Sequence, residues 1–413
     1  MSQHIPPHTP ENTPSSFSLV IICLLIGVNL RPALAAIGPV VTQLQQDTGL
    51  SFSGVAWLTL LPVLAMGIGC FITLWLRRYI SLPRLIHGAL VLLLLANLLR
   101  LMDAGSLNAA ALLFTALLSG SGIAVIQTTL PIVIKSATHD SARVMGFYVS
   151  AIMAGAALAA GLTPYLAQWL AGWRSALAFW ALPAMIAAVA WARWSSRHTM
   201  SFSSPLATQT SVQRLHRSRL LSLIATFSMA AAGYVCVLAW LPPFLMDLGY
   251  SSTQSGLLLG YLTAVEVIAG LLFPAWAAGS KDRRRVLFSV LLLSVFGFIW
   301  LAAFPQATSV LLPLTLLGLG IGGQFPMVMI VTMDHHPDAR QAGSLIGKVQ
   351  GYGYSLAAVT PLMMGNVRDQ LGSFSAAWLA LAVMYGVALL LCSRYNPGRY
   401  LQLLTPAEPP RPV

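Results

Sequence analysis

Three charged side chains lie well inside long apolar stretches of the chain, away from their ends. Arg31 lies near the middle of residues 17–42, Glu266 near the middle of residues 252–278, and Lys348 in the first half of residues 341–366. An ionised side chain at the centre of a bilayer costs about 2.5–3.5 kcal/mol, so such residues usually face a bundle interior or a water-filled path. The planar fork of a guanidinium group suits small planar anions. We therefore predict that Arg31 holds the negative end of a solute.

The three charges leave two arrangements open. In the first, Glu266 pairs with Lys348, Arg31 is left to meet a small monovalent anion, and Glu266 is the candidate proton carrier. In the second, all three residues form a structural ion-pair cluster that locks two parts of the molecule together. Two positive charges against one negative charge favour an anionic solute over a cationic one.

Uncharged polar side chains at matching depths are expected to complete a polar shell around the solute. They are Asn29, Gln127 and Gln324. Helical spacing places Tyr352 on the same face as Lys348, so both are predicted to line the same cavity. The alternative for each amide is a hydrogen bond between two helices.

The composition identifies the environment of these residues. The chain of 413 residues is 57% hydrophobic and only 8% charged, with a mean hydropathy of +0.76, whereas soluble domains carry about 25% charged residues. Apolar runs long enough to cross about 30 Å of hydrocarbon recur twelve times, at residues 17–42, 52–76, 84–102, 107–134, 144–171, 175–194, 220–246, 252–278, 285–304, 309–333, 341–366 and 374–393. The sequence therefore predicts an all-α integral membrane protein with twelve transmembrane helices.

The net charge of +12 is distributed unevenly over the predicted loops. If both termini are cytoplasmic, most Lys and Arg residues fall in the inner loops, and the opposite side keeps only Arg100, Arg174 and Arg368. This is the positive-inside bias of membrane proteins. We predict a protein of the inner (plasma) membrane with both termini in the cytoplasm. No basic patch with interleaved aromatic residues indicates nucleic acid, and the basic residues are expected to contact anionic lipid.

No motif in the sequence indicates a cofactor, a metal site or an enzymatic reaction. The cysteines, Cys23, Cys70, Cys236 and Cys392, fall inside predicted spans without metal-ligand spacing and are interpreted as small packing residues. There is no catalytic triad, phosphate-binding loop or nucleotide-binding domain, so we expect neither an enzyme nor an ATP-driven pump. The expected partners are a small-molecule substrate, the lipid bilayer and protons, and the expected oligomeric state is a monomer.

Short motifs recur in the same order about 200 positions apart. Asp47-Thr-Gly-Leu-Ser returns as Asp247-Leu-Gly-Tyr-Ser, and Gly120-Ser-Gly returns as Gly318-Leu-Gly. Ordered repeats at nearly one shift indicate an internal duplication. We therefore predict two six-helix bundles joined by a cytoplasmic linker and flanked by a disordered N-terminal tail and a C-terminal tail. In chain order, these five parts are residues 1–16, 17–194, 195–219, 220–394 and 395–413.

Two duplicated six-helix halves around a central site are typical of secondary transporters. This pattern resembles the major facilitator superfamily over nearly the whole chain. The segment Gly279-Ser-Lys-Asp282-Arg283-Arg-Arg is similar to that superfamily's inner-loop G-x-x-x-D-R motif, and the resemblance implies a gating role for Asp282 and Arg283. The corresponding first-half loop, residues 77–84, keeps the basic residues but lacks the Gly and the Asp.

Within this superfamily, the chain is most similar to the cyanate permease and nitroimidazole transporter group. The resemblance is carried by Gly27-Val-Asn-Leu-Arg-Pro32, by Gly122-Ile-Ala-Val-Ile-Gln127 and by Gly318-Leu-Gly-Ile-Gly-Gly-Gln-Phe-Pro326. It implies a secondary transporter that moves a small anionic or polar solute, such as cyanate, a nitro compound or a small carboxylate, by symport or antiport. Two alternatives remain open, a proton-coupled drug exporter and a non-transporting membrane sensor.

Overall fold

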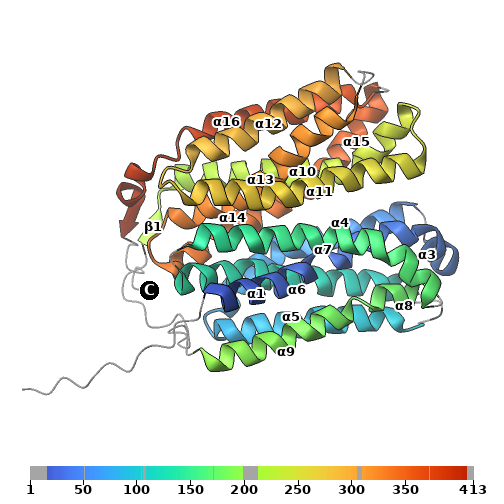
Figure 1. Cartoon of the computed structure of the whole chain (residues 1–413), viewed down its shortest axis with the longest axis horizontal. Coiled ribbons are helices and arrows are strands. Elements are labelled where there is room, and N and C mark those ends of the chain that lie inside the picture. Colours follow the sequence, from blue (N-terminus) through green and yellow to red (C-terminus); the bar gives the residue numbers. More distant parts are fainter. Residues whose placement is uncertain are drawn as a thin grey trace, which may run out of the picture.

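The computed structural model describes residues 16–50, 52–103, 105, 108–138, 140–170, 172–198, 213–304, 309–371 and 373–406. Helices dominate these residues, and Figure 1 shows them as long rods in two groups. The predicted N-terminal tail, apart from Ser16, lies outside the described residues, as do residues 199–212 of the predicted linker and residues 407–413 of the predicted C-terminal tail.

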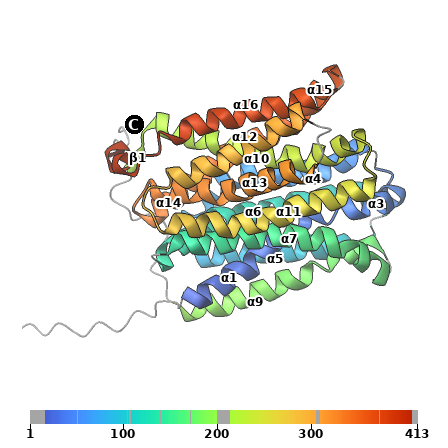
Figure 2. The same ribbon diagram turned by 45° about the horizontal axis from the view of Figure 1, so that its top comes forward.

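The two groups of helices follow the two halves of the chain (Figures 1 and 2). The first half contains α1 (Ser16–Gly27), η1 (Val28–Leu30), α2 (Pro32–Ala35), η2 (Gly38–Val40), α3 (Val41–Thr48), α4 (Phe52–Leu76), α5 (Leu82–Leu98), η3 (Leu99–Leu101), α6 (Asn108–Ala137), α7 (Ser141–Trp169), α8 (Trp173–Ala178) and α9 (Ala181–Arg197). The second half contains β1 (Gln213–Leu215), α10 (Arg217–Asp247), α11 (Ser252–Ala278), α12 (Arg284–Ala303), α13 (Leu311–Asp334), α14 (Ala339–Ala357), α15 (Thr360–Leu371), α16 (Ser375–Cys392), η6 (Pro397–Arg399), η7 (Leu401–Leu403) and β2 (Leu404–Pro406).

The predicted twelve-helix membrane fold is confirmed. Ten stretches of the described residues are long and apolar enough to cross a bilayer, and Leu60–Leu76 within α4 adds a shorter apolar helix. The remaining crossing is formed by α14 and α15 in succession. A short antiparallel pair, β1 with β2, ties the segment before α10 to the C-terminal segment.

Three predicted helices are interrupted rather than continuous. The first crossing breaks between α1 and α2, the sixth is divided into α8 and α9, and the eleventh is divided into α14 and α15. In each case the helix that follows the break carries a proline in its first turn, namely Pro32, Pro183 and Pro361. Proline is tolerated there because the first N–H groups of a helix have no intrahelical partner.

The duplication seen in the sequence is also visible in the structure. Gly49 and Gly249 both have positive φ, +67° and +93°, so each repeated Asp-x-Gly motif ends a helix with a left-handed glycine. Gly120 of α6 packs against Pro62 of α4, and Gly318 of α13 packs in the same way against Leu262 of α11. These partners are 200 positions apart, which fixes the register between the second and eighth crossings.

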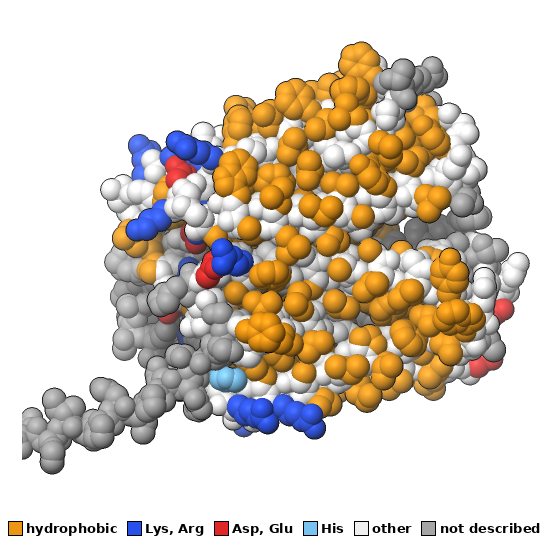
Figure 3. All heavy atoms as spheres, viewed as in Figure 1, with side chains coloured by type: hydrophobic (Ala, Val, Ile, Leu, Met, Phe, Trp, Pro, Cys, Tyr) orange, Lys and Arg blue, Asp and Glu red, His pale blue; other side chains and the backbone are white. Residues whose placement is uncertain are grey.

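Positive charge gathers at one end of the helices, which we call the basic end. It carries Arg77, Lys135, Arg284 and Arg394, and Figure 3 shows Lys and Arg side chains clustered there, at the left. The opposite end, which we call the far end, carries the loops that follow α3 and α10.

The two halves contact each other along α4 with α14 and along α7 with α11. At the basic end this contact is tight. Lys135 of the first half donates to the carbonyl oxygens of Met333 and His336 of the second half. A Cβ atom added at Gly146 of α7 would lie only 2.8 Å from the side chain of Pro274 of α11.

Toward the far end the same helices diverge. A Cβ atom added at Gly161 of α7, or at Gly256 or Gly260 of α11, would meet no other residue within 4 Å in the part of the chain that the structure describes. The halves are therefore closed at the basic end, and α7 and α11 are no longer in contact at these glycines toward the far end.

Candidate functional site

Arg31 lies at the break in the first membrane crossing. Pro32 follows it and has no backbone N–H, so it cannot donate the hydrogen bond that would continue α1; Arg31 itself, with φ −118° and ψ −19°, stays in the right-handed region. Gly155 lets α7 approach so closely that a Cβ atom there would overlap the carbonyl oxygen of Val28. On the other side of the break, Nη2 of Arg100 donates to the carbonyl oxygen of Ala33 at 3.1 Å. These contacts fix the backbone from which the Arg31 side chain projects.

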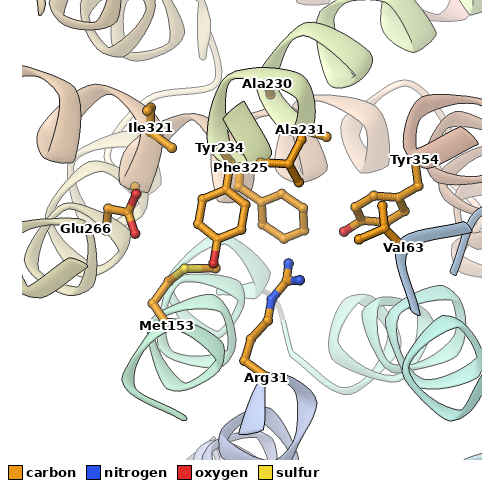
Figure 4. A pocket seen from close by; sticks show the side chains of 12 residues that line it. Arg31, Val63, Met153, Ala230, Ala231, Tyr234, Glu266, Ile321, Phe325 and Tyr354 are labelled. Carbon is orange, nitrogen blue, oxygen red and sulfur yellow. The ribbon is translucent and has the colours of Figure 1, made fainter. Parts of the chain in front are cut away.

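The Arg31 side chain projects into a central cavity of about 30 Å³ between the halves (Figure 4). Its guanidinium group points between the rings of Tyr234 and Tyr354, and Cζ lies 5.3 Å from the centroid of the Tyr234 ring. This distance is within the range of a cation–π interaction. Glu266 of α11 faces the same cavity, and the other lining residues are apolar. The cavity thus joins one cation, one carboxyl group and two phenols.

The two ionisable residues of the cavity do not bond to each other. Arg31 is 5% exposed and Glu266 is 1% exposed, yet the ion pairs found among the described residues include neither of them. Both carboxyl oxygens of Glu266 and Nε of Arg31 also have no hydrogen-bond partner within the described ranges. Buried groups of this kind are costly, so the arrangement is expected where a ligand or a proton completes the site.

Two of the predicted amides, Gln127 and Gln324, are buried beside residues that line the cavity. Gln127 of α6 accepts a hydrogen bond from the Tyr354 hydroxyl at 3.0 Å, and this bond joins the two halves. Its Nε2 has no partner among the described residues, and the same holds for both polar atoms of Gln324 of α13. Phe325, which follows Gln324, lines the cavity.

Asn29 makes a contact between helices and does not line the cavity. Its Nδ2 donates to the carbonyl oxygens of Leu25, at 2.7 Å, and of Pro183 in α9, at 3.2 Å. For Asn29, the structure therefore shows the helix-to-helix alternative.

The predicted positions of Lys348 and Tyr352 require correction. Both are exposed on the outer face of α14, Tyr352 to 50%, and neither lines the cavity. The Tyr352 ring packs edge to face on Phe71. The prediction assumed that a charged residue in an apolar span faces inward, but the long stem of a lysine lets its ammonium group reach the bilayer surface from the outer face of a helix. The predicted Glu266–Lys348 pair and the three-residue cluster are therefore absent.

Sequence reasoning missed the two cavity tyrosines, Tyr234 and Tyr354. For Tyr354, which is 4% exposed, a signal was present. Gly343, Gly347 and Gly351 mark the packed face of α14 at a spacing of four, and Tyr354 lies seven positions after Gly347 on that same face. We find no comparable signal for Tyr234.

The residues of the predicted gating motif form ion pairs at the basic end. Asp282 binds Arg284 at 2.6 Å, and Arg283 binds Asp334 at the end of α13 at 3.1 Å. Hydrogen bonds from Arg284 hold the pKa of Asp282 below its usual value. Arg283 also donates to the carbonyl oxygens of Ala277 and Ser280, so it closes the turn between α11 and α12.

Known proteins share this sequence and this architecture. The chain is 36% identical over 386 residues to the cyanate transport protein of Escherichia coli (strain K12), with 93% of this chain and 99% of that protein covered. It is 30% identical over 373 residues to the 2-nitroimidazole transporter of the same organism, with 89% of this chain and 92% of that protein covered.

A solved structure has the same fold. The transporter FucP in the outward conformation matches with a TM-score of 0.72 at 15% identity, and 92% of this chain and 99% of that chain are covered. The sequence profile of the Major Facilitator Superfamily matches residues 17–361. The chain therefore belongs to the Major Facilitator Superfamily and is a multi-pass secondary transporter of small solutes.

Proposed function

We propose that the protein carries a small monovalent anion, with cyanate as the type case, across the membrane together with a proton. The observation that carries this proposal is Arg31, a cation buried in the central cavity that pairs with no carboxylate of the described residues. A monovalent anion supplies the missing negative charge, and the guanidinium fork can donate two parallel hydrogen bonds to it. The relative named for cyanate transport supports the same choice.

Charge balance in the cavity couples the anion to a proton. When Glu266 is ionised, its charge already offsets that of Arg31. When Glu266 is protonated, the cavity holds one uncompensated positive charge, which attracts an anion strongly in a medium of low dielectric constant. Protonation therefore strengthens anion binding, and anion binding strengthens protonation by the same factor. Glu266 is the proton carrier in this scheme, and symport is the resulting mode.

The remaining polar groups have supporting roles in the proposal. The hydroxyl groups of Tyr234 and Tyr354 and the amides of Gln127 and Gln324 complete the polar shell. Asp282 and Arg283 hold the basic end in the conformation described above and serve the gate. Asn29, Lys348 and Tyr352 do not touch the substrate in this conformation.

The size of the cavity separates the candidate substrates. Pockets for drug-sized ligands measure about 300–1,000 Å³, whereas this cavity measures about 30 Å³. A bulky drug is therefore disfavoured as the substrate in this conformation. A planar nitro compound is the second candidate, because the rings of Tyr234, Phe325 and Tyr354 offer aromatic faces around Arg31.

We place the basic end, and with it both termini, in the cytoplasm and the protein in the inner membrane, on the positive-inside bias. The cavity is then closed toward the cytoplasm in the conformation described here. We also propose a monomer as the working unit, because one chain supplies residues to the cavity from both of its halves.

Uptake into vesicles tests the proposed function. We expect vesicles containing the purified protein to accumulate labelled cyanate when the outside is more acidic, and to accumulate it far less when the proton gradient is collapsed. Vesicles without protein correct for passive entry of the neutral acid. Arg31→Lys should reduce uptake nearly as much as Arg31→Ala, because a point charge cannot reproduce a two-pronged contact. The matched control is Arg78→Lys at an exposed position of the basic end.

Three results would contradict this proposal. Uptake of 2-nitroimidazole but not of cyanate would mean that the substrate is a nitro compound, the second candidate. Wild-type uptake by Arg31→Lys would contradict recognition of the anion through two parallel hydrogen bonds from the guanidinium group. Absence of any solute flux would favour the non-transporting sensor.

A further inference from the structure

A second cavity, remote from Arg31, lies at the basic end within the second half. It measures about 430 Å³ and is formed by the first turns of α10 and α12, the end of α16 and the segment η6–η7. Four arginines line it, Arg219, Arg284, Arg394 and Arg399, together with the polar side chains of Ser393 and Asn396. The proposed transport cycle uses none of these residues.

The positive charge of this cavity is largely uncompensated. Asp282 binds Arg284 at 2.6 Å and is the only carboxylate in an ion pair with a lining arginine among the residues that the structure describes. Arg394 and Arg399 are exposed and form no ion pair with a described residue. Four guanidinium groups converging on one hollow repel one another unless an anion is bound between them.

The arginines are held in place by the surrounding structure. Arg219 is buried, donates to the carbonyl oxygen of Arg394 and lies over the ring of Tyr395 at 5.7 Å. The Tyr395 hydroxyl bonds to Thr226 and Ser222 of α10, at 2.7 and 2.8 Å. The pairing of β1 with β2 also holds the last described residues of the C-terminal segment, 404–406, against the segment before α10. The C-terminal segment is therefore fastened in a position that brings Arg394 and Arg399 to the cavity.

Exposed apolar side chains continue from the cavity along the outside of the helices. Phe288 lies one helical turn after Arg284 on α12, and Leu390 lies in the last turn of α16, four positions before Arg394; both apolar side chains are exposed. Arg284 and Phe288, four positions apart, share a face of α12, and Arg394 follows the end of α16 close to Leu390. Each arginine therefore adjoins an exposed apolar side chain. This is the pattern expected for a phosphate headgroup with its acyl chains.

We propose that this cavity binds a phosphate-bearing anion, supplied by the headgroup of an anionic lipid of the same leaflet or by a free phosphate. Guanidinium groups bind phosphate with paired, charge-assisted hydrogen bonds, and Ser393 and Asn396 add neutral polar groups to the lining. The bound anion would bridge the starts of α10 and α12 to the C-terminal segment.

Binding to delipidated protein in a non-ionic detergent tests the proposal. The probes are phosphatidylglycerol, phosphatidylcholine with the same acyl chains, glycerol phosphate and inorganic phosphate. Native mass spectrometry counts bound lipid, and the thermal midpoint reports binding of each probe. The pocket variant is Arg394→Gln/Arg399→Gln. The matched control is Arg193→Gln/Arg197→Gln, which removes two exposed arginines from the same end of the first half.

We expect wild-type protein and the control variant to retain phosphatidylglycerol and to be stabilised by it. The pocket variant should bind it roughly tenfold or more weakly, and phosphatidylcholine should not substitute. If inorganic or glycerol phosphate gives the same difference between the variants, the source is a free phosphate. The proposal is overturned if the pocket and control variants lose binding equally, or if no phosphate-bearing probe distinguishes the pocket variant from the wild type.

Discussion

The two halves of the molecule are built alike but place their charges differently. At the shift of 200 positions that relates the first and seventh crossings, Arg31 corresponds to Ala231, and both line the central cavity. At the same shift, Glu266 of the eighth crossing corresponds to Met66 of the second. The first half therefore contributes a cation and the second half a carboxyl group, each opposite an apolar counterpart. A duplicated fold has become a chemically asymmetric site.

The backbone differs between the halves at the same place. The first crossing is broken at Arg31 into α1 and α2, whereas the seventh, α10, is one helix from Arg217 to Asp247. Discontinuous helices are typical of substrate sites in transporters because the break exposes backbone groups and re-aims side chains. We infer that the break sets the direction of the Arg31 side chain. The equivalent position on the continuous helix α10 is not sufficient to direct a side chain in the same way.

Exchanging the two positions tests this inference and should produce the largest effect. Arg31→Ala should abolish cyanate uptake, because charge-assisted hydrogen bonds contribute about 1.5–3 kcal/mol, or roughly 10- to 150-fold in affinity. The double variant Arg31→Ala/Ala231→Arg keeps the charge in the cavity but places it on a continuous helix. We expect no recovery of uptake in vesicles. Recovery would show that the break in the first crossing is dispensable.

The second prediction concerns the carboxyl group. A gradient of one pH unit supplies about 1.4 kcal/mol per proton, enough for about tenfold accumulation of a symported anion. Glu266→Gln keeps the shape of the side chain and removes the proton site, so accumulation against a gradient should be lost. Exchange of labelled for unlabelled cyanate, which needs no net proton movement, should continue. Unchanged proton-driven accumulation by this variant would exclude Glu266 from coupling.

A matched pair of tyrosines on α14 gives the third prediction. Tyr354→Phe removes the hydroxyl that donates to Gln127 across the two halves. The amide oxygen of Gln127 then lacks its donor, which should lower the free energy of unfolding by about 1–3 kcal/mol. Tyr352→Phe removes a hydroxyl from the outer face and keeps the ring packed on Phe71. Thermal shifts and uptake should be altered by the first change and not by the second. Equal effects would contradict our assignment of the inner face of α14.

The sequence was sufficient to predict the membrane fold, because apolar runs, basic loops and repeated Asp-x-Gly motifs are local signals. It also singled out Arg31 and Glu266, which both line the central cavity, because a charged residue in an apolar span is conspicuous whichever way its side chain points. It did not orient α14, because Lys348 was assumed to face inward when its long stem allows the opposite. The prediction of a continuous first crossing failed for a related reason: Pro32 was present, but the packing of α7 at Gly155 and the Arg100 contact that stabilise the break are tertiary.

The halves also differ at the basic end, where His335 follows α13 and Ala137, 198 positions earlier, ends α6. His335 is 0% exposed and stacks on the Tyr400 ring at 3.9 Å between centroids. Burial, reinforced by the positive charges of Arg219 and Lys135, lowers the pKa of His335 to about 4, although a hydrogen bond to Val331 opposes this shift. In the unfolded chain the pKa of a histidine is about 6.5.

This difference in pKa gives the last prediction, which concerns stability and not transport. Between pH about 6.5 and about 4 the unfolded chain binds the proton and the folded chain does not, so the free energy of unfolding falls as the pH is lowered through this window. The contribution of the neutral His335 ring to the free energy of unfolding is fully present above pH about 6.5 and should amount to about 1–3 kcal/mol. His335→Phe keeps an aromatic ring against Tyr400 and removes the titrating group, so the loss of thermal stability between pH 7.5 and pH 4.5 should be smaller than in the wild type. His216→Phe, at an exposed position of the same end, is the control for loss of a histidine. An identical pH dependence in wild type and His335→Phe would mean that His335 is not buried as a neutral ring in the protein in solution.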